Sequence, residues 1–228
     1  MTGEERKARE AMVATCRAMD AKGINQGTAG NLSLRFGDGF LITPSSLDYD
    51  LMQAEDIVQM GWDGSYVGRR PSSEWRFHRD ILQARGDVEV VLHCHSVFAT
   101  SVACHHLNIP AFHYMVGVMG GNSLRCARYE TFGTQALSSA ALEALEGRMA
   151  CLLGQHGQIA LGKTLEQALW MAVEVETLAR MYLQARVIGE PPVLDDAEMA
   201  RVIGQMQRMS YGLGPQDAAE SVAHPRKA

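Results

Sequence analysis

Val90-Val91-Leu92-His93-Cys94-His95 is the stretch that decides the fold and the chemistry of this chain. The apolar run predicts a buried strand, and side chains two positions apart on a strand project from the same face of the sheet. We therefore expect His93 and His95 on one face and Cys94 on the other. Two imidazoles on one face can bind one metal ion, although histidines are also found half-buried without a ligand role.

The composition is that of a globular protein with a small-molecule partner. The chain has 228 residues, of which 46% are hydrophobic, and a formal net charge of -5. No basic cluster is present, which argues against nucleic acid or an anionic membrane as partner. The charged N-terminus has no signal-peptide core and no apolar run approaches the length of a membrane span, so we expect a cytoplasmic protein. The five cysteines lack Cys-x-x-Cys spacing and are expected to be reduced, mostly core thiols.

Hydrophobic periodicity predicts a sheet covered by helices. A first helix over 4–22 ends at Gly23. Residues 32–36 and 40–43 flank Gly37-Asp38-Gly39, which is typical of a β-hairpin. Other strands are expected at 57–60, 90–95, 149–153 and 159–161, and other helices after residue 73 and at 97–107, 134–145, 164–187 and 195–209. This order favours an α/β fold with a largely antiparallel sheet, as one domain over 1–214 with a mobile tail over 215–228.

A third metal ligand is needed beside His93 and His95, and His156 is a candidate. It follows an apolar strand, in a turn flanked by Gly154 and Gly157 that lets the backbone approach another group closely. Three imidazoles and one open position are the arrangement with which Zn²⁺ polarises a substrate oxygen. The spacing does not show that His156 reaches the other two.

Glu74 is the best candidate for an acid or base, because it stands at the start of a helix directly after Ser72 and Ser73. Acidic residues are also favoured at that position by the helix dipole alone. The two serines can likewise cap the helix or, with the free N–H groups of its first turn, bind a phosphate.

Two other loops rich in small polar residues contain Thr28 and Asn31, and Ser45 and Ser46. If these loops converge with the serines before Glu74, they can hold a phosphate by neutral hydrogen bonds. Three separate turns are the simpler interpretation. The aromatic residues Tyr114 and Phe132 lie in or near glycine-containing loops, where packing in a core or an interface is their ordinary role.

Several motifs together resemble the class II L-fuculose-phosphate aldolases, of the class II aldolase and ribulose-phosphate 4-epimerase family. The resemblance extends from the first helix to Tyr211-Gly212-Leu213. Its motifs are Gly27-Thr28-Ala29-Gly30-Asn31, Leu41-Ile42-Thr43-Pro44, Pro71-Ser72-Ser73-Glu74-Trp75-Arg76-Phe77-His78, His93-Cys94-His95, Ile109-Pro110-Ala111-Phe112-His113-Tyr114-Met115, Gly120-Gly121-Asn122-Ser123 and Thr131-Phe132-Gly133-Thr134.

The resemblance implies a three-layer α/β/α fold and a homotetramer with active sites between neighbouring subunits. It implies Zn²⁺ bound by His93, His95 and His156, with Glu74 close enough to ligate the resting metal. It implies that the phosphate of a sugar phosphate substrate is bound by Thr28, Asn31, Ser45, Ser46, Ser72 and Ser73. It implies that the aldehyde end is lined by Phe132 and Tyr211.

The implied reaction is the cleavage of a ketose 1-phosphate to dihydroxyacetone phosphate and an aldehyde. Tyr114, from the neighbouring subunit, takes the proton of the C4 hydroxyl, the C3–C4 bond breaks, and Glu74 protonates C3. L-Fuculose 1-phosphate and 5-deoxy- or 5-methylthio-ribulose 1-phosphate are all conceivable substrates, because an apolar pocket discriminates such aldehyde ends only modestly. One departure concerns Ser46, which replaces a glycine of the related aldolases; a positive φ there would strain the loop.

Other activities share the same metal chemistry. L-Ribulose-5-phosphate 4-epimerase is one alternative, but its counterpart of Glu74 is typically aspartate, so Glu74 favours cleavage. Methylthioribulose-1-phosphate dehydratase is another. A non-catalytic binding or assembly module is the alternative of a different class, against which the complete set of expected ligands argues.

Overall fold

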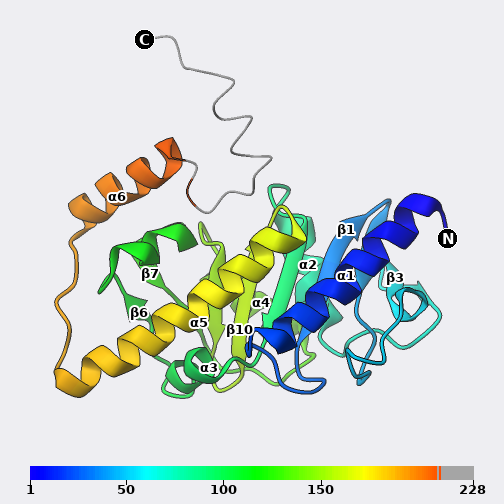
Figure 1. Cartoon of the computed structure of the whole chain (residues 1–228), viewed down its shortest axis with the longest axis horizontal. Coiled ribbons are helices and arrows are strands. Elements are labelled where there is room, and N and C mark those ends of the chain that lie inside the picture. The colour runs from blue at the N-terminus through cyan, green and yellow to red at the C-terminus, as the bar shows by residue number, and fades with distance from the viewer. Residues whose placement is uncertain (210, 212–228) are drawn as a thin grey trace, which may run out of the picture.

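The computed structural model describes residues 1–209 and residue 211 and is built around an eight-stranded sheet (Figure 1). The strand order is β4-β3-β2-β1-β5-β10-β9-β8, and all neighbours are antiparallel except β8 and β9. The strands are β1 (Asn31–Phe36), β2 (Gly39–Ile42), β3 (Val58–Gly61), β4 (Tyr66–Val67), β5 (Val90–Cys94), β8 (Cys126–Ala127), β9 (Ala150–Leu153) and β10 (Gly157–Gly162). β6 (Ile109–Pro110) and β7 (Ser123–Leu124) form a separate pair.

Strand β5, which ends one residue before His95, lies between β1 and β10 and is buried along its whole length. Its side chains alternate between the two faces of the sheet as expected. Leu92 and Cys94 pack into the core on one face, and Val91 packs into the core on the other. A strand covered on both faces is apolar throughout, which explains the unbroken run before His93.

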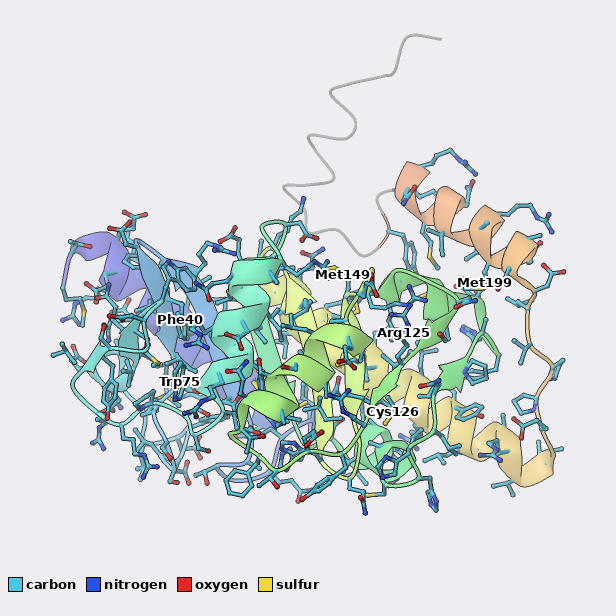
Figure 2. The ribbon with its side chains drawn as sticks, turned by 180° about the vertical axis from the view of Figure 1, so that it is seen from behind. Phe40, Trp75, Arg125, Cys126, Met149 and Met199 are labelled. Carbon is cyan, nitrogen blue, oxygen red and sulfur yellow. The ribbon has the colours of Figure 1, made fainter. Side chains whose placement is uncertain are left out.

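Helices cover both faces of the sheet and give the three layers that were expected. On one face lie α1 (Gly3–Ala21), α3 (Val97–Ala103) and the long α5 (Leu165–Ile188) (Figure 1). On the other lie α2 (Trp75–Ala84) and α4 (Gln135–Ala144), which pack against each other and against the sheet. Figure 2 shows the molecule from this second side, with Phe40 and Trp75 toward one end and Met199 of α6 at the other.

The remaining helix, α6 (Asp196–Arg208), packs against the 3₁₀ segment η2 (Tyr114–Met119); a shorter 3₁₀ segment, η1, spans Ala54–Asp56. Four helices begin at a side chain that accepts a hydrogen bond from a backbone N–H of the first turn. These capping residues are Thr2, Thr134, Thr164 and Asp195. No helix in the described part of the chain is both long and apolar enough to cross a membrane.

Some local expectations were wrong. The helix expected over 97–107 ends at Ala103, and His106 just beyond it has a left-handed backbone with φ 54°. Asn31, expected in a loop, opens β1. The two-residue strands β4, β6, β7 and β8 were not predicted, because so short a segment carries no periodicity. Cys104 is exposed rather than buried. The expected tail over 215–228 lies outside the described residues.

Candidate active site

Three histidines that were expected to share a metal ion come together at one end of β5. β10 pairs with β5 so that Ile159 lies opposite His93, and the turn preceding β10 therefore brings His156 beside His93 and His95. One nitrogen from each of the three imidazoles lies within 4.8 Å of the others. His93 Nε2 and His95 Nε2 are 3.0 Å apart. The strand register thus explains a convergence that the spacing in sequence does not show.

Gly157 makes this close approach possible. A Cβ at this position would lie 2.6 Å from the Cys94 carbonyl oxygen and 2.9 Å from His95 Cδ2. Such distances are far shorter than a van der Waals contact, so only glycine fits here. The expectation that the backbone of this turn approaches another group closely is confirmed, and the group is the histidine pair itself.

The imidazoles are held neutral, as metal ligation requires. Burial, with His95 nearby, lowers the pKa of His93 to about 3. Burial, with His93 nearby, lowers the pKa of His156 to about 4. His93 Nδ1 lies 2.8 Å from the Gln158 carbonyl oxygen and donates to it, which leaves the lone pair of Nε2 facing the other imidazoles.

Glu74 joins the three histidines. Its Oε2 lies 3.2 Å from His93 Nε2, and its Oε1 lies 3.3 Å from His156 Nε2. The residue occupies the N-cap position of α2, but its side chain makes no capping hydrogen bond. A side-chain capping hydrogen bond therefore does not account for it.

A metal ion fits this group of donors. Glu74 Oε1 is buried and has no hydrogen-bond partner among the described residues, an arrangement that is costly unless a cation or a proton satisfies the oxygen. Three neutral imidazole nitrogens and one carboxylate oxygen are a donor set that Zn²⁺ accepts. His93, His95, His156 and Glu74 are thus positioned to hold such an ion.

Asn31 contacts Glu74 directly. It lies opposite His93 in the β1–β5 register, and its Nδ2 donates a hydrogen bond of 3.0 Å to Glu74 Oε2. Its Oδ1 is 2.5 Å from His78 Nε2. The sequence analysis assigned no role of its own to His78. The signal that was missed is its spacing of four residues from Glu74, which places both side chains on one face of α2.

The polar loops converge above Glu74 in a pocket of about 320 Å³. Backbone contacts join the second and third loops: Pro44 pairs with Pro71, and the Ser45 N–H donates to the Arg70 carbonyl oxygen at 2.9 Å. No lysine or arginine is among the described lining residues. The hydroxyl groups of five candidate phosphate-binding residues line the pocket, those of Thr28, Ser45, Ser46, Ser72 and Ser73, and Asn31 lines it as well.

Ser46 has a left-handed backbone with φ 56°. For a residue with a Cβ this left-handed conformation costs about 1–2 kcal/mol relative to the right-handed one. The strain anticipated from the replacement of glycine is therefore present, and it is located in the pocket wall.

The candidate aromatic residues are divided between two places. Phe132 lines the pocket of Glu74 and is 65% exposed at its mouth. Tyr114 and Tyr211 instead line a pocket of about 520 Å³ against α6, and each is 47% exposed. Within one chain, neither Tyr114 nor Tyr211 is among the residues that line the pocket of Glu74, although Tyr129 is.

Comparison with known proteins agrees with this geometry. Residues 10–183 match the family model described as Class II Aldolase and Adducin N-terminal domain. The chain is 49% identical over 213 residues to a 5-methylthioribulose-1-phosphate/5-deoxyribulose-1-phosphate aldolase of Rhodospirillum rubrum, covering 93% of this chain and 96% of the relative. It is 46% identical over 212 residues to the L-fuculose phosphate aldolase of Escherichia coli, covering 92% and 98%.

A solved structure of L-fuculose 1-phosphate aldolase superposes with a TM-score of 0.86 at 35% identity, covering 91% of this chain and 98% of that one. Fold, sequence and the grouping of polar residues lead to the same conclusion. The chain belongs to the class II aldolase family, and its relatives place it among the aldolases of that family.

Proposed function

We propose that this chain catalyses the zinc-dependent retro-aldol cleavage of a ketose 1-phosphate to dihydroxyacetone phosphate and an aldehyde. The observation that carries the proposal is the position of Glu74. Its carboxylate contacts the neutral imidazoles of His93 and His156 and lines a pocket together with serine and threonine residues. Relatives named for 5-methylthio- and 5-deoxyribulose 1-phosphate and for L-fuculose phosphate support a substrate of this class.

The phosphate group is proposed to bind at the three converging loops. Thr28, Ser45, Ser46, Ser72 and Ser73 supply hydroxyl donors, and the N-terminus of α2 adds the favourable end of a helix dipole. The Asn31 amide is already engaged by Glu74 and His78, so only its second N–H remains for the phosphate. Neutral donors would fix the orientation of the phosphate without an ion pair.

The reaction would consist of one proton transfer, the cleavage of the C3–C4 bond and a second proton transfer, in this order. When bound by His93, His95, His156 and Glu74, Zn²⁺ would act as a Lewis acid toward the substrate carbonyl. Tyr114, as phenolate, takes the C4 hydroxyl proton; the C3–C4 electron pair moves toward the carbonyl, and C4 leaves as the aldehyde. Glu74, once it no longer ligates the metal and has taken up a proton from solvent, protonates C3 to give dihydroxyacetone phosphate. Exchange with solvent then restores both residues.

The assembly is proposed to be a homotetramer, in which a neighbouring subunit supplies Tyr114 to the pocket of Glu74. The exposure of Tyr114 and Tyr211 and their distance from the pocket within one chain support this arrangement. Phe132 and the neighbour's Tyr211 would line the aldehyde end. Residues 1–214 would act as a single catalytic domain. The free cysteines among the described residues agree with a cytoplasmic location.

The decisive experiment is the release of dihydroxyacetone phosphate from a panel of ketose 1-phosphates. Metal-loaded protein, chelated protein and protein restored with zinc are compared, and the panel includes L-fuculose, 5-deoxyribulose and 5-methylthioribulose 1-phosphates. Release that is lost on chelation and regained with zinc supports the proposal, and the ranking of substrates names the preferred aldehyde. Metal-loaded, folded protein that releases none contradicts it, and epimerase and dehydratase assays would then be run on the same preparation.

A further inference from the structure

A chain of buried hydrogen bonds runs from the sheet to Glu74. Ser33 Oγ lies 2.7 Å from His78 Nδ1, His78 Nε2 lies 2.5 Å from Asn31 Oδ1, and Asn31 Nδ2 donates at 3.0 Å to Glu74 Oε2. Ser33 and His78 are both 0% exposed. Ser33 and Asn31 are two residues apart on β1, and His78 and Glu74 are four apart on α2. Residues of the strand and of the helix therefore alternate along the chain of hydrogen bonds.

The direction of each hydrogen bond follows from chemistry. An ionised carboxylate only accepts, so the amide NH₂ of Asn31 must face Glu74 and its Oδ1 must face His78. His78 Nε2 therefore carries a proton. The imidazole is fully buried with no carboxylate in contact, which keeps it neutral, and its Nδ1 then accepts from the Ser33 hydroxyl.

We propose that His78, oriented by Ser33, is a positioning residue that holds the Asn31 amide in the one orientation that donates to Glu74. With Oε2 engaged in this way, the carboxylate is turned so that its other oxygen, Oε1, has no hydrogen-bond partner among the described residues and lies 3.3 Å from His156 Nε2. This inference rests on the proposed acid-base role of Glu74 and explains how that carboxylate is kept in place when it exchanges a proton.

A purely structural role for His78 explains less. Apolar side chains fill the rest of this core, and His78 stacks on Phe77 there with ring centroids 4.6 Å apart. A buried polar set costs stability unless every member is satisfied, so packing alone does not call for a histidine at this position. What distinguishes the histidine is the donor that it directs at Asn31.

The first test reads the tautomer of His78 directly, without metal or substrate. Nitrogen NMR of protein labelled with ¹⁵N-histidine is expected to show one neutral histidine protonated at Nε2, whose signals are absent from His78→Gln. A His78 protonated at Nδ1 overturns the proposal.

The second test uses two substitutions of nearly equal length. His78→Gln retains an N–H donor near the position of Nε2, whereas His78→Met has none. For His78→Met we expect the turnover number, and the exchange of the C3 proton of dihydroxyacetone phosphate in D₂O, to fall by about 10- to 100-fold. KM and bound zinc should stay within about twofold, because His78 itself touches neither the phosphate nor the metal. His78→Gln should recover to within about threefold.

Wild-type rates in folded His78→Met, or a His78→Gln that is folded but equally impaired, contradict the inference. If His78→Met does not fold, the tautomer measurement together with the rates of Ser33→Ala and His78→Gln still decides it. Failure of the proposed function gives a different result: the wild-type protein itself would cleave no ketose 1-phosphate, while the NMR measurement would still report whether His78 donates to Asn31.

Discussion

Glu74 Oε1 lies 3.3 Å from His156 Nε2, and this contact joins the start of α2 to the turn between β9 and β10. The contact links the proposed acid-base group with a proposed metal ligand. Glu74 follows a serine loop, whereas His156 lies in a glycine-flanked turn far along the chain. Because Oε1 has no hydrogen-bond partner in the described part of the chain, the oxygen is available to a metal or a proton.

Substituting Glu74 by Gln tests its role in proton transfer. The amide has nearly the shape of the carboxylate but cannot exchange a proton, so turnover should fall by about 10²- to 10⁴-fold. Zinc content and the melting temperature should change little, since three imidazoles remain. Steady-state kinetics with metal analysis measures both quantities. Near-normal activity would remove Glu74 from the acid-base role.

Tyr114→Phe tests the assignment of the second proton transfer. The ring is retained and the hydroxyl is lost, so turnover should fall by at least about 10²-fold while zinc binding is unchanged. An unchanged rate would mean that another group takes the C4 hydroxyl proton.

Mixing two inactive variants tests whether sites form between subunits. A site that combines Glu74 of one subunit with Tyr114 of its neighbour is intact when a Tyr114→Phe subunit meets a Glu74→Gln subunit. After co-refolding in equal amounts, about one quarter of the sites should be active by random pairing. Activity no higher than that of either variant alone would place both residues in one chain.

Gly157→Ala should weaken metal binding. The added Cβ would overlap the Cys94 carbonyl oxygen and the His95 ring, so the imidazoles must move apart. We expect zinc affinity to fall by about 10- to 100-fold, measured by competition with a chelator. Gly86→Ala is the matched control, because nothing lies within 4 Å of its added Cβ. Equal zinc affinities of the two variants would contradict the role of Gly157 in bringing the imidazoles together.

Ser46→Gly should relieve backbone strain in the pocket wall. Glycine adopts φ 56° without penalty but loses more entropy on folding, which leaves a net gain of about 0.5–1 kcal/mol in the free energy of unfolding. Thermal denaturation measures the gain. A lower melting temperature would show that the serine side chain stabilises the loop. A raised KM for the ketose 1-phosphate would show that its hydroxyl binds the phosphate.

The metal-free protein should lose stability as the pH falls below about 6.5, the ordinary pKa of histidine. Burial lowers the pKa of His93 to about 3 and that of His156 to about 4 in the folded state. Between these values and 6.5 the unfolded chain binds more protons than the folded one, so stability rises with pH across this range. Chemical denaturation from pH 7 to 4.5 measures the slope. His156→Phe should reduce it, exposed His105→Gln should not, and a flat wild-type profile would contradict the assignment.

The sequence by itself determined the layers of the fold and the identity of the candidate ligands. A continuous apolar run ending in His93-Cys94-His95 specifies a buried strand and one metal-binding face, because alternation along a strand is fixed by backbone geometry. The start expected for the long helix at Thr164 agrees with the structure, where the Thr164 side chain caps α5, since a cap acts locally.

Only the tertiary structure decided which distant residues meet. The β5–β10 register brings His156 to the histidine pair, the Pro44–Pro71 bridge joins two serine loops, and the β1–β5 register sets Asn31 beside Glu74. The role of His78 became apparent only from its contact with Asn31 on β1. Register and loop contacts depend on the packing of the whole sheet, and no local pattern encodes them.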